Sequence, residues 1–194
     1  MKIRGITGGI GSGKSVVLNI MKDDYNAYIL EADSLAHRLM EPGQAAYNKI
    51  LEAFGEDILA EDRSIDRAVL GKIVMQDKDK LDTLNSCVHP TVKEYILGDI
   101  EDKREKGTDL YVIEAALLIQ DGYKSICDEL WYVYANRELR ISRLIAGRGF
   151  TREKAESFMN NQPDEKFFTD NVDKIIDNNG DIDKTKSSVA SVLS

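Results

Sequence analysis

Short apolar runs separated by charged or turn-forming residues predict five β-strands. The first run alternates and stops where a group of glycines begins, and the second, "AYILEAD", ends in acidic residues. A short continuous apolar run of this kind is typical of a strand buried in a parallel sheet. The predicted strands lie near residues 2–7, 27–32, 110–115, 130–135 and 173–177.

Apolar residues at helical spacing predict helices between these strands. The segment 14–22 carries such a stripe, and residues 66–107 alternate apolar and charged positions over a long region. Glycines separate two further helices, "NRELRISRLIAGR" and "TREKAESFMNNQ", and a last helix closes the chain. His89 precedes Pro90, whose ring disfavours helical geometry in the residue before it, so we expect a helix break there.

This alternation indicates an α/β fold with a parallel sheet, because right-handed crossovers connect parallel strands. The stretch between the second and third strands is far longer than a simple crossover needs. We therefore expect a helical insertion there, which is a candidate substrate-binding subdomain.

The composition narrows the class of protein. Of the 194 residues, 42% are hydrophobic and 31% are charged, which is the balance of a soluble globular enzyme. The net charge of −8 disfavours nucleic acid as a partner. No apolar stretch is long enough for a signal peptide or a membrane span, so we expect a cytoplasmic protein. Cys87 and Cys127 are interpreted as free thiols of a reducing compartment, although their spacing leaves a disulfide open.

The segment "GITGGIGSGKSVV" holds five of the 14 glycines and supplies the strongest chemical signal. Residues 8–15 fit the phosphate-loop pattern G-x-x-x-x-G-K-[ST], and a predicted strand and helix flank them. In such a loop, backbone N–H groups surround a phosphate, the lysine reaches the β- and γ-phosphates, and the serine hydroxyl binds Mg²⁺. The alternative is a glycine-rich turn with a solvated lysine. The predicted ATP-binding residues are Gly8, Gly9, Gly11, Ser12, Gly13, Lys14, Ser15 and Val16, with Ser15 also as the metal ligand.

The rest of the sequence favours a small-molecule kinase over a GTPase, because no guanine-specifying N-K-x-D segment occurs. Asp33 follows the second strand, where ligands of such sheets bind, and is a candidate general base for an attacking hydroxyl. The alternative role for Asp33 is an N-cap of the helix that begins at Ser34 or Leu35. Glu114 ends the third strand and either acts on Mg²⁺ through water or is a polar residue at the crevice.

Four arginines form a second group. Arg137, Arg140 and Arg143 recur at every third residue, and a solvated helix surface explains one or two of them. Arg148 lies between Gly147 and Gly149, as expected for a hinged lid that brings an arginine to the transferring phosphate.

The two histidines carry less information. His37 lies on a predicted helix and His89 at an expected helix end, so both are interpreted as structural. If the insertion binds the acceptor, Asp33, His37 and His89 are the candidate substrate-binding residues.

These segments resemble the dephospho-CoA kinase family over essentially the whole chain. "GITGGIGSGKS" resembles the start of the family, and "EADSLAHRLM" matches its Asp-Ala-Asp segment with Glu31 in place of the first aspartate. "LNSCVHPTV", "LRISRLIAGRGFTREKAESFMNNQ" and "VDKIIDNNG" are similar to its His-Pro segment, its lid and its final strand. The usual Pro-Leu-Leu-Phe-Glu segment differs, because Ala116 and Gln120 stand where the family has proline and glutamate.

The resemblance implies a phosphate-loop NTPase three-layer sandwich with a five-stranded parallel sheet, a helical insertion and a lid. The implied division is a core of 1–33, 108–145 and 166–194, an insertion of 34–107 that binds CoA, and a lid of 146–165. The implied reaction transfers the γ-phosphoryl of ATP, with Mg²⁺, to the ribose 3′-hydroxyl of dephospho-CoA. Asp33 matches the general base, Arg148 matches the lid arginine after a one-residue shift, and Arg143 and Asn178 join the candidate ATP-binding residues.

Two other functions stay open at this point. One is another nucleoside or nucleotide monophosphate kinase, and the other is a non-catalytic regulator that binds ATP. In each case we expect small-molecule partners, no nucleic acid or membrane, and a monomer or weak homo-oligomer.

Overall fold

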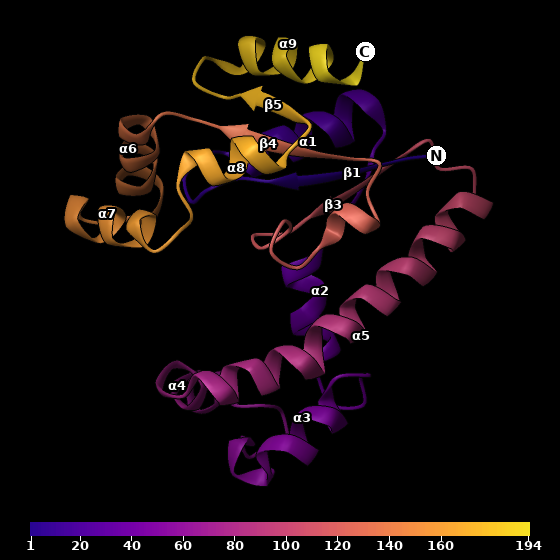
Figure 1. The fold of residues 1–194 in the computed structure, drawn as a ribbon, viewed down its shortest axis with the longest axis vertical. Helices are drawn as coiled ribbons and strands as arrows, with labels where there is room; N and C mark the ends of the chain where they lie inside the picture. Colours follow the sequence, from indigo (N-terminus) through magenta and orange to yellow (C-terminus); the bar gives the residue numbers. More distant parts are fainter. The chain divides into compact units, whose positions relative to one another are not determined.

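Five parallel strands form one sheet in the order β2-β3-β1-β4-β5 (Figure 1). The computed structural model describes residues 1–194. In the register, Lys2 pairs with Leu110, and Thr7 pairs with Tyr132. The strands are β1 (Lys2–Thr7), β2 (Tyr28–Glu31), β3 (Leu110–Glu114), β4 (Glu129–Tyr134) and β5 (Lys174–Asp177). The predicted α/β fold is confirmed, and each predicted strand boundary lies within one residue of the observed one.

The chain divides into two compact units, which we call the core unit (residues 1–30 and 104–194) and the helical unit (residues 31–103). Helices of the helical unit are α2 (Ala32–Leu39), α3 (Tyr47–Phe54), α4 (Arg67–Gln76) and α5 (Lys78–Glu105), which ends just inside the core unit, with the 3₁₀ turn η1 (Glu56–Ile58). Those of the core unit are α1 (Lys14–Tyr25), α6 (Arg137–Arg148), α7 (Arg152–Asn160), α8 (Glu165–Asn171) and α9 (Ile182–Leu193), with the 3₁₀ turn η2 (Tyr123–Ser125).

Helices cover both faces of the sheet in the core unit. Side chains of α1 and α9 form one hydrophobic cluster with alternate residues of β1, β3, β4 and β5, among them Ile6, Trp131 and Ile176. On the other face, Phe168 of α8 stacks on Tyr132 of β4 with ring centroids 4.7 Å apart. Burying both faces explains why β3 and β4 are continuous apolar runs rather than alternating ones.

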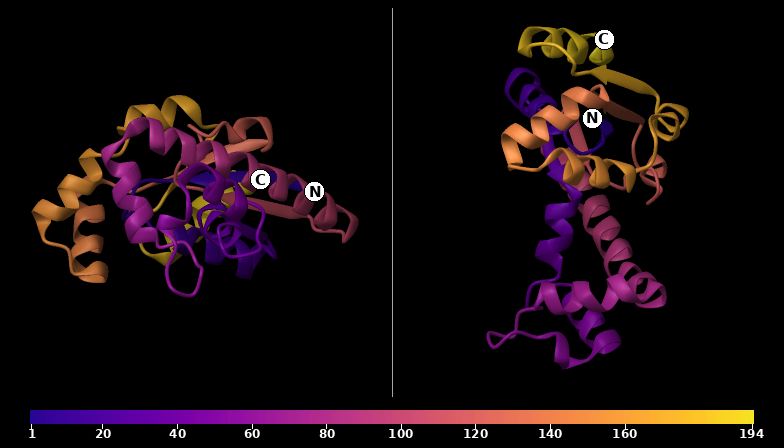
Figure 2. Two further views of the ribbon diagram at one scale, coloured as in Figure 1. Left: turned by 90° about the horizontal axis from the view of Figure 1, so that it is seen from below. Right: turned by 90° about the vertical axis from the view of Figure 1, so that its left-hand side faces the viewer.

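The helices α6 and α7 lie side by side (Figures 1 and 2). Ile141 and Leu144 of α6 pack on Ala155 and Met159 of α7 in a small core of their own. Both Gly147 and Gly149 were expected to lie between these helices. In the structure Gly147 lies inside α6, and only Gly149, at φ 63°, ends the helix. Thr151 then caps α7 by accepting from the N–H of Lys154.

Two other local predictions were wrong. The helix break expected at His89 is absent, since α5 continues through Pro90. The flanking residues Cys87, Val88, Thr91 and Val92 are buried, so packing outweighs the hydrogen bond that proline removes. Helix α8, capped by Asp164, was not predicted at all. None of the helices combines the length and apolar character that crossing a membrane requires.

Candidate active site

The loop between β1 and α1 has the shape that binding an anion requires. It follows Thr7, the last residue of β1, and leads into Lys14, the first residue of α1. Gly11 and Gly13 have φ values of 78° and 86°, in the left-handed region that favours glycine. The backbone N–H groups of Gly13, Lys14 and Ser15 donate to no acceptor in the protein. With the partial positive charge of the helix N-terminus, these amides form a ready site for phosphate.

Protein contacts add a second reason for the loop glycines. We expected glycine because side chains would block the phosphate. In the structure, a Cβ on Gly13 would overlap the side-chain amide of Asn178, and a Cβ on Gly9 would overlap the guanidinium of Arg140. A Cβ on Gly8 would lie 2.8 Å from Oγ of Ser12, a buried hydroxyl without a hydrogen-bond partner. Packing against neighbouring residues therefore restricts these positions even without a ligand.

Lys14 folds back onto its own loop. Its Nζ donates to the carbonyl oxygen of Gly8 at 2.9 Å and lies 3.5 Å from Oε1 of Glu114 at the end of β3. Both side chains are mostly buried, so the pair is screened less than a surface ion pair. The lysine charge is thus held beside the open amides of the loop.

The start of α1 also fits a magnesium ion carried with a nucleotide. Ser15 and Val16 are exposed there, and the Ser15 hydroxyl is the hard oxygen ligand that Mg²⁺ prefers. No group of three or more acidic, histidine or cysteine side chains gathers anywhere to hold a metal. Since Mg²⁺ is commonly bound through one or two protein oxygens plus substrate phosphates, the Ser15 hydroxyl fits an ion that a nucleotide carries.

Arg143 and Asn178, both predicted to bind ATP, hold the loop in this structure. The Arg143 guanidinium donates to the carbonyl oxygens of Ser12 at 3.1 Å and of Asn178 at 2.9 Å. The Asn178 side-chain amide donates to the same Ser12 oxygen at 2.7 Å and accepts from the hydroxyl of Thr185 at 2.7 Å. Asn178 is only 2% exposed. Both residues therefore fix the loop backbone, and a direct contact with nucleotide stays a prediction.

In the helical unit, the capping role considered for Asp33 is wrong. Helix α2 begins at Ala32, one residue before Asp33, and no side chain caps it. Asp33 is exposed in the first turn, where a negative charge is favourable to the helix dipole. His37 lies four residues later, also exposed, so the two side chains share one face of α2. His89 is half-buried on α5.

The role expected for Arg148, that of a lid arginine brought to the transferring phosphate, stays a prediction. Arg148 is the last residue of α6, and its side chain is exposed. Arg137 is also exposed and donates to Oδ1 of Asn160 at 3.1 Å. It is therefore one of the arginines expected on the solvated surface of the helix. Arg148 is therefore an accessible arginine at the junction of α6 and α7.

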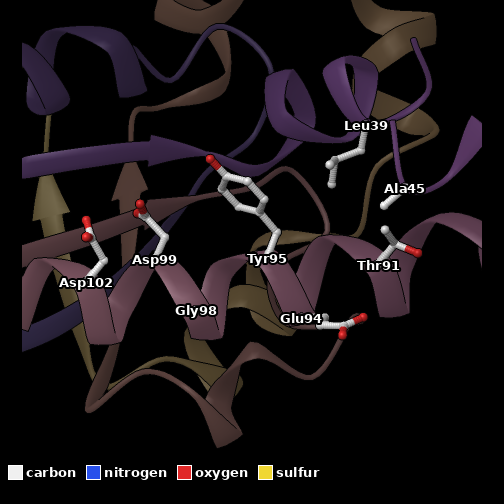
Figure 3. A pocket seen from close by; sticks show the side chains of 8 residues that line it. All are labelled: Leu39, Ala45, Thr91, Glu94, Tyr95, Gly98, Asp99 and Asp102. Atoms are coloured by element: carbon white, nitrogen blue, oxygen red, sulfur yellow. The ribbon is translucent and has the colours of Figure 1, made fainter. Parts of the chain in front are cut away.

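A cavity of about 490 Å³ lies within the helical unit, between α5, α2 and the segment after α2 (Figure 3). Tyr95, Asp99 and Asp102 project from one side of α5 in this view, as their helical spacing requires. Cζ of Arg38 lies 5.4 Å from the centroid of the Tyr95 ring, and Nη2 of Arg38 donates to the Tyr95 hydroxyl at 3.1 Å. The other lining residues are Leu39, Ala45, Thr91, Glu94 and Gly98.

The sequence did not identify all residues around the loop. Gln162 and Thr185 were not recognised as loop partners, because their positions near the loop depend on packing between distant segments. Arg140 was noticed only as part of a repeating arginine pattern, although its side chain turns inward. The signal that could have found it is its position three residues before Arg143 on one helix face.

Comparison with known proteins agrees with this geometry. The family model for dephospho-CoA kinase matches residues 2–184. A dephospho-CoA kinase of Carboxydothermus hydrogenoformans is 38% identical over 193 residues, which cover 100% of this chain and 93% of that protein. A crystal structure of a Thermus thermophilus protein has a TM-score of 0.81 at 26% identity, over 99% of this chain and 96% of the other.

A dephospho-CoA kinase structure from Campylobacter jejuni has a TM-score of 0.72 at 24% identity, over 100% of this chain and 96% of that one, and supports the phosphate-loop kinase fold. The phosphate loop, the fold around it and similarity along the full length agree, and the chain belongs to the dephospho-CoA kinase family.

Proposed function

We propose that this protein transfers the γ-phosphoryl group of ATP to the ribose 3′-hydroxyl of dephospho-CoA, which is the last step of coenzyme A synthesis. The observation that carries the proposal is the row of unpaired amides at Gly13, Lys14 and Ser15, beside a paired lysine. A loop of this kind is suited to a polyphosphate, and the family membership supports dephospho-CoA as the acceptor.

The phosphate loop would hold the donor. Its amides donate to phosphate oxygens, and Lys14 exchanges the Gly8 carbonyl for the β- and γ-phosphates. Ser15 would hold Mg²⁺, which supplies charge neutralisation on the phosphates. Because the loop backbone is already fixed by Arg143 and Asn178, binding needs little reorganisation.

Asp33 and Arg148 are proposed for the transfer itself. The 3′-hydroxyl oxygen attacks the γ-phosphorus, the bond between that phosphorus and the β–γ bridging oxygen breaks, and ADP leaves. Asp33 orients the hydroxyl and accepts its proton. Arg148 stabilises the charge that develops on the transferring group.

The helical unit is proposed to hold the acceptor. Carboxylates of Asp99, Asp102 and Glu94 line its cavity and disfavour a diphosphate there, whereas the neutral, amide-bearing arm of dephospho-CoA can donate to them. Arg38, stacked on Tyr95, is a cation suited to the diphosphate. His37 and His89 remain candidate contacts on the same unit.

Measurement of ADP release with a panel of acceptors tests the proposal. Dephospho-CoA should give ADP and coenzyme A in equal amounts, with the new phosphate placed on the 3′ position by ³¹P NMR. Nucleosides and nucleoside monophosphates should give much slower release. Faster turnover of a nucleoside monophosphate would favour the alternative kinase, and no turnover despite ATP binding would favour a regulator.

An amide NMR titration locates the two substrates. ATP should shift mainly the signals of residues 8–16, and dephospho-CoA those near His37, Arg38 and His89. Dephospho-CoA that leaves the helical unit unchanged would contradict its assignment as the acceptor site. The cytoplasmic location and the monomer or weak homo-oligomer stay predictions.

A further inference from the structure

We propose that Gln162 and Arg140 are positioning residues that fasten Ile10, at the tip of the phosphate loop, to the helices α6 and α7. This inference deepens the proposed function and rests on the assignment of the loop to nucleotide. It goes beyond that assignment because neither side chain belongs to the phosphate-loop motif.

Both backbone polar groups of Ile10 are bound by these side chains. The Ile10 N–H donates to Oε1 of Gln162 at 2.8 Å, and Nε of Arg140 donates to the Ile10 carbonyl oxygen at 2.8 Å. Nη2 of Arg140 donates to the same Gln162 oxygen at 3.1 Å. The three groups thus close a ring of hydrogen bonds, which we call the tip latch. Burial lowers the pKa of Arg140, but a guanidinium stays charged at neutral pH, which strengthens both of its bonds.

The side chain of Ile10 is held by the same two helices. It packs against the small core formed by Ile141, Leu144, Ala155 and Met159. Apolar packing of its side chain and hydrogen bonds to its backbone therefore both hold Ile10 in place. The latch connects the loop to α6 through Arg140 and to the segment after α7 through Gln162.

The glycines on either side of Ile10 make this close approach possible. A Cβ on Gly11 would lie 2.8 Å from the carbonyl oxygen of Arg140 and 3.2 Å from Cγ of Leu144. A Cβ on Gly9 would overlap the Arg140 guanidinium. The two glycines that flank Ile10 thus let the loop backbone lie against α6.

The consequence is a mechanical connection between the lid and the nucleotide site. Any movement of α7 that displaces Gln162 releases the Ile10 amide, and the loop that carries the open amides then loses one of the contacts that order it. The latch therefore pre-organises the phosphate cradle when α6 and α7 are in the arrangement seen here.

Three variants test the tip latch. Gln162→Leu keeps the size of the side chain but removes the acceptor, Gln162→Glu keeps the acceptor, and Asn160→Leu removes the bond between Arg137 and Asn160. That last bond joins the same two helices without contacting the loop, so it is the matched control. ATP affinity is measured by calorimetry without an acceptor, and Ile10 amide exchange by NMR in the free protein.

Gln162→Leu should weaken ATP binding by about tenfold and speed exchange of the Ile10 amide by a similar factor, the usual scale for losing one charge-assisted bonding partner. Gln162→Glu should restore both values, and Asn160→Leu should change neither. If Gln162→Leu does not fold, Arg140→Lys replaces it, since it loses the fork that makes both bonds.

Unchanged exchange at Ile10 in Gln162→Leu would overturn the latch. Equal losses in Asn160→Leu would also overturn it, because the effect would then be that of general helix stability. Neither readout needs dephospho-CoA, so an error in the acceptor would leave this test intact. Absence of ATP binding in the wild type would instead refute the proposed function itself.

Discussion

Nζ of Lys14 lies 3.5 Å from Oε1 of Glu114, so the lysine of the phosphate loop is paired with a carboxylate from the neighbouring strand. β1 and β3 are adjacent in the sheet, and the register pairs Ile6 with Glu114. The loop and the carboxylate are therefore placed together by sheet topology alone. The arrangement holds the lysine Nζ between the Gly8 carbonyl oxygen and the Glu114 carboxylate, beside the open amides of the loop.

Replacing this lysine should stop the reaction without unfolding the protein. Lys14→Ala removes the charge that stabilises the transferring phosphate, so we expect turnover to fall by at least about 10²–10³-fold. The exposed Lys22→Ala in the same helix α1 is the control and should be nearly normal. Near-normal turnover of Lys14→Ala, with an unchanged circular dichroism spectrum, would refute the loop assignment.

Asp33→Asn separates catalysis from stability. Asn keeps the shape of the side chain but loses the basic oxygen, so turnover should fall by roughly 10²–10⁴-fold while both substrates still bind. Since Asp33 caps no helix, only its interaction with the helix dipole is lost, about 0.3–1 kcal/mol. Turnover and melting temperature are measured together, and Glu31→Gln, at the residue just before the same helix, is the control. Full activity of Asp33→Asn would exclude the base role.

The strands could be predicted from the sequence, but the contacts that shape the site could not. Buried parallel strands appear as apolar runs, so each of the five was found with small boundary errors. Glycine spacing likewise placed the phosphate loop. In contrast, Arg143 reaches Ser12, and Gln162 reaches Ile10, across more than a hundred residues of sequence. Such partners depend on how α6 and α7 pack, which residue type alone does not specify.

The two local errors, at Pro90 and at Asp33, have different origins. Pro90 usually ends a helix, but buried neighbours on α5 outweigh one lost hydrogen bond. Asp33 was a candidate cap because the helix was expected to begin at Ser34 or Leu35, whereas α2 begins at Ala32. Tertiary packing thus overrides local propensity at Pro90, whereas at Asp33 the helix begins at least two residues earlier than expected.

Arg148→Lys tests the lid arginine. Lysine keeps the charge but loses the planar fork that holds two phosphate oxygens, so turnover should fall by at least about tenfold. ATP affinity should change much less, because the contact forms mainly in the transition state. Arg152→Lys, which affects a surface pair with Glu138, is the control. Matched losses of affinity and turnover would make Arg148 a ground-state contact, and no effect would move the role to Arg143 or Arg140.

Gly13→Ala should destabilise the protein and weaken nucleotide binding together. Its φ of 86° is unfavourable for alanine by about 1–2 kcal/mol, and the new Cβ would displace the Asn178 amide from Ser12. Gly147→Ala is the matched control, because it lies inside α6 with nothing within 4 Å of an added Cβ. The control should gain about 0.5–1 kcal/mol of stability. Equal melting temperatures for the two variants would contradict the packing role of Gly13.

The buried thiol of Cys127 should make the folded protein less stable at alkaline pH. Burial, aided by the charge of Asp128, raises the pKa of this thiol to about 12. In the unfolded chain a thiol titrates near about 8.5, so between these values the unfolded state releases a proton that the folded state keeps. The free energy of unfolding must therefore fall as the pH rises above the thiol pKa of the unfolded chain. Below that pKa the contribution of Cys127 to stability is fully retained.

The test of that alkaline effect compares melting temperatures at about pH 8 and about pH 10, on either side of the unfolded thiol pKa. Cys87→Ala retains Cys127 as the sole thiol, and the double variant with Cys127→Ala removes it. Lysine and tyrosine titrations are common to both proteins, so the difference between their pH dependences belongs to Cys127. The double variant should lose less stability on going to the higher pH. A thiol reagent should also modify Cys127 no faster than the protein unfolds, because the buried thiol stays protonated. Identical pH dependences, or rapid modification of the folded protein, would show that this thiol is exposed to solvent.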